Sequence, residues 1–363
     1  MGKKTRNSTG MFFVAGVAIA LSMMGCAAKE APKAAEAPAA SAKKELGKIR
    51  IGTMPSTMGV PVQYAHEMGY FKDEGLDVEL SMFPSGAPIN EAIAAGQLDV
   101  AASGLASVFP LANGIASWIG EGNTTGGMGI YVRKDSKLLA NKGLVSGKPN
   151  MYGSAESIKG TKFIGPIGTS AQFNVMRYIQ QFSLTDKDIS MIHMEHGQAY
   201  QAFIAGQGDA IASSPPYTYQ LSGLGYVLLA SFEDATEAPL FDGLLATNTF
   251  LKSSPEKVKA FVSGYYKACQ AFTDDEKLRF DFSKKWFTAN GREPTDQAMS
   301  DEIRDRKYVT KAMMTSPGYQ FGKGMVAIAE FYTNDGKIAK ENVPNVSKSF
   351  YTKAIEELMG IKF

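Results

Sequence analysis

The chain is poor in the residue types on which disulfides, metal sites and much catalysis depend. Its 363 residues include two cysteines, Cys26 and Cys269, and three histidines. This inventory excludes a disulfide framework and a Cys/His metal site. No Ser/His/Asp order or paired-carboxylate motif stands out, so we expect neither an enzyme nor a bound metal or cofactor.

An excess of charge of either sign is also lacking. The sequence has 38 basic and 36 acidic side chains, a net charge of +2, and the basic residues are dispersed. A nucleic-acid-binding protein usually carries a basic patch or stripe. We therefore expect no nucleic-acid partner.

The N-terminus is typical of an export signal. Lys3, Lys4 and Arg6 precede the apolar stretch MFFVAGVAIALSMMG at 11–25, which is short for a membrane span. Cys26 follows Gly25 and resembles the lipidation cysteine of a bacterial lipoprotein. Met23 and Met24 replace the usual Leu and Ala/Ser of that motif. Cleavage after Ala28 is the alternative and would release a soluble periplasmic protein. We expect residues 1–26 to be the signal.

Residues 27–47 form a low-complexity run of Ala, Pro, Lys and Glu. It has almost no residues to bury and is expected to be a flexible tether, with a reach of roughly 25 Å. A lipid-anchored domain on such a tether would sit in the periplasm or at the cell surface. Cys269, on the apolar stretch VKAFVSGYYKACQAF, is expected to be a core residue.

From residue 48 the hydrophobic pattern alternates between strands and helices. Strands are predicted at 48–54, 76–83 and 98–103, with helices at 60–75 and 87–96 between them. The same order recurs, with strands at 161–167, 189–194 and 209–214 and helices at 171–183 and 198–206. Such β-α-β-α-β order favours a mostly parallel sheet flanked by helices. The sequence therefore predicts an α/β protein with two lobes.

A short repeat supports the two lobes. AIAAGQLDVAAS at 92–103 and AFIAGQGDAIAS at 202–213 match at seven of twelve positions. In each copy the glycine suits the left-handed residue that ends a helix, and the aspartate suits the turn into the next strand. Ser103 and Ser213 then end their strands at the carboxyl edge, where open α/β sheets bind ligands. We expect the two copies to form equivalent walls of one cleft.

Four longer stretches carry a family resemblance. They are GVPVQYAHEMGYFKDEGLDVEL, FPSGAPINEAIAAGQLDVAASG, SIKGTKFIGPIGTSAQFNVMRYI and FIAGQGDAIASSPPY. Over residues 48–360 the chain resembles substrate-binding proteins of ABC importers for sulfonates, taurine, nitrate and thiamine-pyrimidine precursors. The resemblance implies the two-lobed fold of a type II periplasmic binding protein. Lobe 1 would comprise 48–134 and 246–363, and lobe 2 would comprise 135–245, with crossings near 133–136 and 243–247. C-terminal helices, including 255–272, would pack on lobe 1.

The resemblance also implies a function and a set of ligand contacts. A monomer would capture a small organic anion or zwitterion in the cleft and deliver it to a membrane permease with its ATPase. Helix N-termini carry free N–H groups that suit an anionic head group. The expected ligand-binding residues are Met58, Gly59, Ser85, Gly86, Ser103, Gly104, Leu105, Thr169, Ser170, Gln172, His196, Gln198, Ser214, Tyr217 and Asp242.

The charge of the expected cleft leaves the ligand open. We place no arginine or lysine there, so an anion would rest on helix ends and hydroxyls. Glu121, Glu195 or Asp242 could meet an ammonium group. In SSPPY at 213–217, Ser214 and Pro215 stand where relatives commonly carry tryptophan and aspartate. A taurine-like zwitterion and a ring compound, such as a pyrimidine precursor or an aromatic acid, are both compatible with the sequence.

Two other classes of protein share this fold. A pyrimidine synthase of the family is marked by a cysteine-rich run, which this chain lacks. The export signal also argues against a cytosolic biosynthetic enzyme. A ligand-sensing module that acts through a separate membrane partner is the second alternative.

Overall fold

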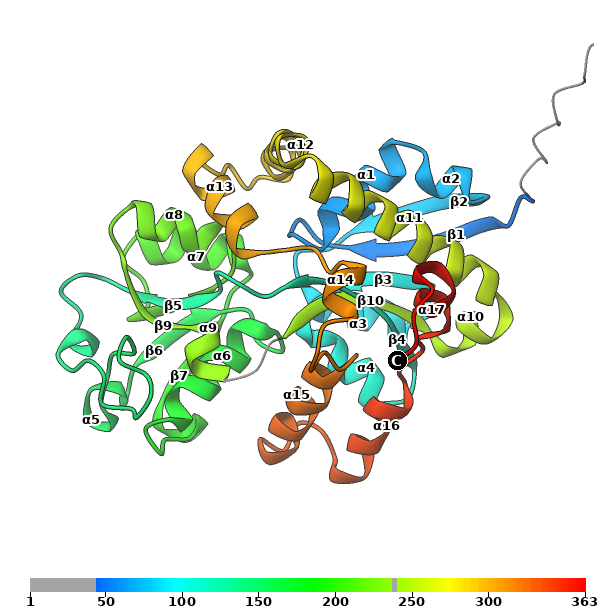
Figure 1. Ribbon diagram of the computed structural model, residues 1–363. Coiled ribbons are helices and arrows are strands. Elements are labelled where there is room, and N and C mark those ends of the chain that lie inside the picture. Colours follow the sequence, from blue (N-terminus) through cyan, green and yellow to red (C-terminus); the bar gives the residue numbers. More distant parts are fainter. Residues whose placement is uncertain (1–43, 237–239) are drawn as a thin grey trace, which may run out of the picture. The chain divides into compact units, whose positions relative to one another are not determined.

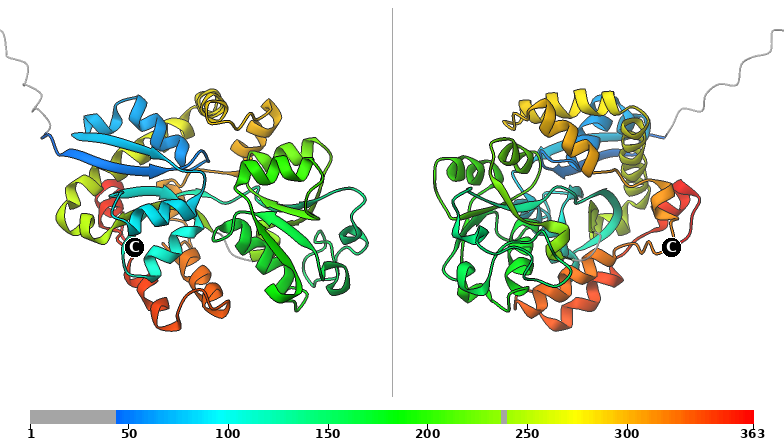
Figure 2. Two further views of the ribbon diagram at one scale, coloured as in Figure 1. Left: turned by 180° about the vertical axis from the view of Figure 1, so that it is seen from behind. Right: turned by 60° about the vertical axis from the view of Figure 1, so that its left-hand side comes forward.

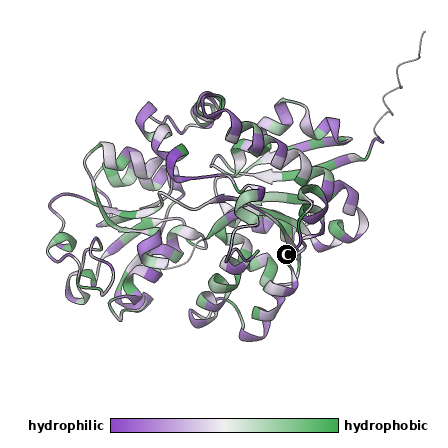
Figure 3. Cartoon of the chain, viewed as in Figure 1, coloured by the Kyte–Doolittle hydropathy of each residue, from purple (hydrophilic) through white to green (hydrophobic). Residues whose placement is uncertain are grey.

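The computed structural model describes residues 44–236 and 240–363 (Figure 1). Cys26, the export signal and nearly all of the expected tether lie outside these residues. Two five-stranded sheets form the centre of the described part. Figure 3 shows hydrophobic residues along the strands and hydrophilic residues on the outer helical turns. Within the described ranges, no helix is long and apolar enough to cross a membrane.

The first sheet has the strand order β2-β1-β3-β10-β4. β1 pairs in parallel with β2 and β3, whereas β10 runs antiparallel to β3 and β4. The strands are β1 (Gly47–Thr53), β2 (Leu76–Met82), β3 (Val100–Ser103), β4 (Ala116–Thr124) and β10 (Phe241–Thr247). The helices between them are α1 (Gly59–Glu67), α2 (Tyr70–Asp73), α3 (Gly86–Ala94) and α4 (Val108–Ala112).

The second sheet repeats this plan with the order β7-β6-β8-β5-β9. β6 pairs in parallel with β7 and β8, and β5 runs antiparallel to β8 and β9. The strands are β5 (Gly129–Val132), β6 (Lys162–Gly165), β7 (Ser190–His193), β8 (Ala210–Ser213) and β9 (Val227–Ser231). The helices are α5 (Ala155–Ile158), α6 (Ser170–Gln180), α7 (His196–Ile204), α8 (Tyr217–Gly223) and α9 (Phe232–Thr236). Two α/β lobes are thus present (Figure 2).

The two copies of the sequence repeat occupy equivalent places in the two lobes. Both glycines that end the helices have left-handed φ angles, 68° in the first copy and 95° in the second. The aspartates do more than shape a turn. Asp99 accepts a 2.8 Å hydrogen bond from the backbone N–H of Arg50, and Asp209 accepts one of the same length from Lys162. Each carboxylate therefore ties its turn to the neighbouring parallel strand.

The crossings between lobes differ from those we expected. β5 was assigned to lobe 1, but it pairs with β8 and β9 in the second sheet. The first part of β10 was assigned to lobe 2, but the whole strand pairs in the first sheet. β5 is the first strand after the chain enters the second lobe, and β10 is the first strand after the chain returns to the first lobe. Both crossings therefore lie earlier in the chain than the expected positions, 133–136 and 243–247.

The C-terminal helices extend over both lobes. α11 packs against α1 and α2 of the first lobe, as expected, and Cys269 is buried within it. α13, in contrast, contacts α8 of the second lobe. The bounds are α10 (Asn248–Ser253), α11 (Pro255–Asp274), α12 (Glu276–Ala289), α13 (Asp296–Asp305), α14 (Lys311–Met314), α15 (Lys323–Asn334), α16 (Val343–Lys348) and α17 (Lys353–Met359).

Candidate ligand-binding site

A small cavity of about 40 Å³, lined by both polar and apolar residues, lies between the two lobes. We call it the interlobe cavity. A space of this size holds roughly two or three water molecules, or a head group of a few atoms. Its lining residues are Met54, Ser56, Met58, Ser85, Gly86, Gly104, Leu105, Ala106, Met128, Thr169, Ser170, His196, Ser214, Asp242, Arg292 and Arg306.

The structure brings ten of the fifteen expected residues to this cavity. Nine of them come from the segments that follow the parallel strands of both sheets, which is where the sequence pattern placed a cleft, and Asp242 belongs to the antiparallel strand β10. These residues are Met58, Ser85, Gly86, Gly104, Leu105, Thr169, Ser170, His196, Ser214 and Asp242.

The other five expected residues lie elsewhere. A Cβ at Gly59 would stand 2.7 Å from the ring of Trp286, so this glycine serves close packing. Gln172 accepts a 2.9 Å hydrogen bond from the N–H of Gly168 and stays within its own lobe. Gln198 is exposed to solvent.

Ser103 and Tyr217 complete this group of five. Ser103 is fully buried behind the cavity wall, with its hydroxyl oxygen 3.2 Å from the position of a Cβ at Gly86. Tyr217 lines a neighbouring pocket instead of the cavity.

Helix N-termini from the two lobes meet at the cavity. Thr169 precedes α6, and its side-chain oxygen accepts a 3.2 Å hydrogen bond from the N–H of Ala171. Ser85 precedes α3 and donates a 3.2 Å hydrogen bond to Glu195, the residue that precedes α7. Ser85 and Glu195 are 110 residues apart, the same interval as the sequence repeat. Equivalent helices of the two lobes are therefore linked at their first turns.

Two buried arginines, neither of them among the expected residues, line the cavity. Arg306 is 2% exposed; its Nε donates to the carbonyl of Gly126 at 2.9 Å, and its Nη1 lies 3.4 Å from Asp242 Oδ2. Arg292 is 5% exposed, and its guanidinium stacks over the Tyr217 ring at 5.4 Å. Within residues 44–236 and 240–363, Arg306 Nη2 and Arg292 Nη1 have no hydrogen-bond partner. The expectation that the cleft lacks arginine was therefore wrong.

The sequence offered no direct signal for these arginines. Both flank α13, in the stretches GREP and RDRKY, outside the segments that carry the family resemblance. They reach the cavity because the chain on either side of α13 crosses toward the second lobe. Tyr219 of α8 donates a 2.6 Å hydrogen bond to Asp305, at the end of α13.

Burial shifts the pKa values of the acids and of the histidine at the site. Burial raises the pKa of Asp242 to about 6, although the nearby Arg306 acts in the opposite direction. Burial also raises the pKa of Glu302, which accepts a 2.6 Å hydrogen bond from Thr57. Burial lowers the pKa of His196 to about 3, so this imidazole is neutral at physiological pH. Burial lowers the pKa of Arg292, but a guanidinium group stays protonated at physiological pH.

Two α/β lobes with a small cavity between them are typical of a solute-binding protein of the periplasmic type. The chain belongs to the NMT1-like family, whose profile matches residues 42–281. It is 28% identical over 313 residues to a candidate ABC transporter periplasmic binding protein of Brachyspira hyodysenteriae. The match covers 86% of this chain and 88% of that protein.

Solved structures agree with the fold. The alkanesulfonate-binding protein of Xanthomonas axonopodis pv. citri, bound to MOPS, matches with a TM-score of 0.67 at 18% identity, over 86% of this chain and 100% of the other. The nitrate-binding protein of Synechocystis PCC 6803 matches with a TM-score of 0.67 at 14% identity, over 86% of this chain and 88% of the other. The predicted two-lobed fold is confirmed. The relatives are binding proteins, which also confirms the prediction that the chain is not an enzyme.

Proposed function

We propose that this protein is the extracytoplasmic solute-binding component of an ABC importer and that it captures a small organic anion or zwitterion in the interlobe cavity. The observation that carries the proposal is the pair of buried arginines. Arg292 Nη1 and Arg306 Nη2 are donors without partners among the described residues, at the junction of the two lobes.

Buried donors of this kind are costly to leave unpaired, whereas a hydrogen bond from a charged donor to an anion contributes about 1.5–3 kcal/mol. An anionic head group would satisfy both guanidinium groups. The hydroxyls of Ser85, Thr169 and Ser170 would supply further contacts from both lobes. The same positive charge disfavours a simple cation.

The second part of the proposal concerns delivery and location. The bound solute would pass to a membrane permease driven by its ATPase, as the description of the Brachyspira relative suggests. The mature protein would act as a monomer in the periplasm or at the cell surface. Lipidation of Cys26 would anchor it to the membrane, with residues 27–47 as the tether.

Calorimetry on the purified mature protein tests the role of the arginines. Taurine, methanesulfonate, nitrate, small aromatic acids and pyrimidines are screened first by thermal shift. Arg292→Gln should weaken binding of the best anion about 10- to 150-fold, the loss expected for one charge-assisted hydrogen bond.

Arg304→Gln is the matched control, because Arg304 lies in the same segment but its side chain is 62% exposed, pairs with Asp301 and Asp305, and does not line the interlobe cavity. It should bind as tightly as the wild type. Unchanged affinity in Arg292→Gln would contradict the anion site. Conversion of a bound hit into a new product would contradict the assignment as a binding protein.

A further inference from the structure

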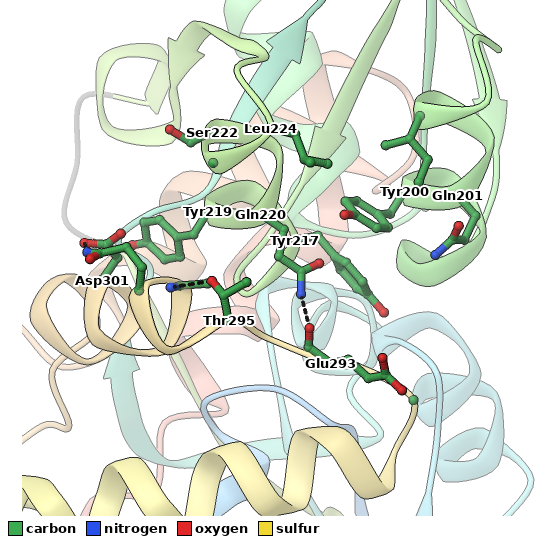
Figure 4. A pocket seen from close by; sticks show the side chains of 15 residues that line it. Tyr200, Gln201, Tyr217, Tyr219, Gln220, Ser222, Leu224, Glu293, Thr295 and Asp301 are labelled. Carbon is green, nitrogen blue, oxygen red and sulfur yellow. Dashed lines mark hydrogen bonds between the residues drawn. The ribbon is translucent and has the colours of Figure 1, made fainter.

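A second and much larger pocket lies directly beside the interlobe cavity. Its volume is about 760 Å³, within the range of small-molecule sites. We call it the tyrosine pocket, because the rings of Tyr200, Tyr217 and Tyr219 line it (Figure 4). One wall comes from α7 and α8 of the second lobe, and the other comes from the chain around the start of α13.

The side chains of Arg292 and Tyr217 meet where the two spaces adjoin. Gly291 and Glu293 line the tyrosine pocket, whereas Arg292 between them lines the interlobe cavity. The Arg292 guanidinium stacks on the inner tyrosine, Tyr217, at 5.4 Å from the ring centroid. The Tyr217 hydroxyl lies 3.1 Å from the position of a Cβ at Gly197, next to the cavity residue His196. The contact between the two spaces is thus a buried stack of the Arg292 guanidinium on the Tyr217 ring.

We propose that the ligand is an elongated organic anion, with one acidic head group in the interlobe cavity and an uncharged, planar body in the tyrosine pocket. This inference rests on the proposed function, since it assumes that the arginines bind the head group. The interlobe cavity alone accommodates only a few atoms. When Arg292 turns toward the head group it leaves the Tyr217 ring, and the two spaces join.

The chemistry of the tyrosine pocket specifies the body of the ligand. The Tyr200 and Tyr217 rings lie 5.0 Å apart at an angle of 31°, and such aromatic faces suit a planar ring. Glu293 places a carboxylate on the opposite wall, where it would repel a second negative charge, whereas Asp301 on the same wall is paired with Arg304. A ring-bearing monoanion therefore fits better than either a short anion or a dianion.

Gly223 offers a way to fill the tyrosine pocket without disturbing the fold. It lines the pocket at the end of α8, and a Cβ added there meets no atom within 4 Å. Gly223→Trp should block the body of the ligand, and Gly223→Ala is the matched control. Leu224→Trp is the second blocking variant, because Leu224 also lines the pocket and is 60% exposed.

The probes are two matched pairs, methanesulfonate with benzenesulfonate and acetate with benzoate, measured by calorimetry on the mature protein. In the wild type and in Gly223→Ala, the ring-bearing member of a pair should bind at least tenfold more tightly. Gly223→Trp or Leu224→Trp should remove this advantage and leave the affinity for the ringless member unchanged.

Three outcomes would overturn the inference in distinguishable ways. Equal affinities for ringed and ringless anions in the wild type would overturn the elongated ligand and leave the anion site standing. If the ring-bearing anions still bind more tightly in both Gly223→Trp and Leu224→Trp, the elongated ligand is likewise overturned and the anion site stands. Absence of binding for all four probes would overturn this inference, and absence of binding for every compound of the thermal-shift screen would overturn the proposed function as well.

Discussion

Replacing Asp242 with asparagine should make the protein more stable at neutral pH. This carboxyl is 2% exposed at the interlobe cavity, and burial raises its pKa from the ordinary 3.8 to about 6. Arg306 Nη1 at 3.4 Å and a 3.0 Å hydrogen bond from Asn123 favour the charged form, but they do not compensate for burial. Ionisation of Asp242 is therefore less favourable in the folded chain than in the unfolded chain.

The size of the effect follows from the two pKa values. They differ by about two, and each pH unit corresponds to about 1.36 kcal/mol, so ionisation lowers the free energy of unfolding by about 3 kcal/mol. A raised pKa of an acid means that this loss is absent below about pH 4, grows between pH 4 and 6, and is constant above pH 6. Asp242→Asn keeps the shape without the charge. Its melting temperature should exceed that of the wild type by about 4–5 °C at pH 7.5.

Thermal and urea unfolding at pH 4 and pH 7.5 check this prediction. The difference between variant and wild type should be largest at pH 7.5 and close to zero at pH 4. Asp242→Asn should also bind anions more tightly at pH 7.5, because a negative charge beside Arg306 is gone. Glu121→Gln is a useful control: burial raises the pKa of Glu121 to about 7, but this residue does not line the cavity, so only stability should change.

A less stable Asp242→Asn at pH 7.5 would refute the reasoning. It would mean that the contact with Arg306 outweighs the desolvation of the carboxylate. A stability difference that is the same at both pH values would refute it as well, because the effect would then not arise from ionisation.

The features that the sequence predicted well are those with local causes. A glycine with positive φ ends each repeat helix, and the alternation of apolar residues identifies the parallel strands. The exchange of β5 and β10 between the expected lobes has no local cause. These strands carry the same apolar pattern as their neighbours, and their placement depends on pairing with strands about 80 or more residues away.

The residues of the candidate site also fall into two groups, those with a local sequence signal and those without one. Ser85, Thr169 and Ser214 follow strands of the two sheets, and the carboxyl edge of a sheet is a general binding position. Arg292 and Arg306 instead flank a helix whose sequence, DQAMSDEIRD, is that of a solvated surface helix. Their burial depends on α13 docking on the second lobe, which no local pattern reveals.

Two further predictions concern the anchor and the head-group contact. Growth with labelled palmitate should label the wild type, whereas Cys26→Ser should be unlabelled and soluble; an unlabelled wild type would favour cleavage after Ala28. At the start of α6, Ser170→Ala should weaken anion binding about threefold to tenfold, the loss of one neutral hydrogen bond. Thr169→Asp should nearly abolish it. Thr169 accepts a hydrogen bond from the N–H of Ala171, and aspartate is an equally good residue at this helix position, so the fold should persist. Its new charge would face the bound anion, because Thr169 lines the interlobe cavity. If Thr169→Asp bound the anion as tightly as the wild type with an unchanged melting temperature, the head group would lie away from α6.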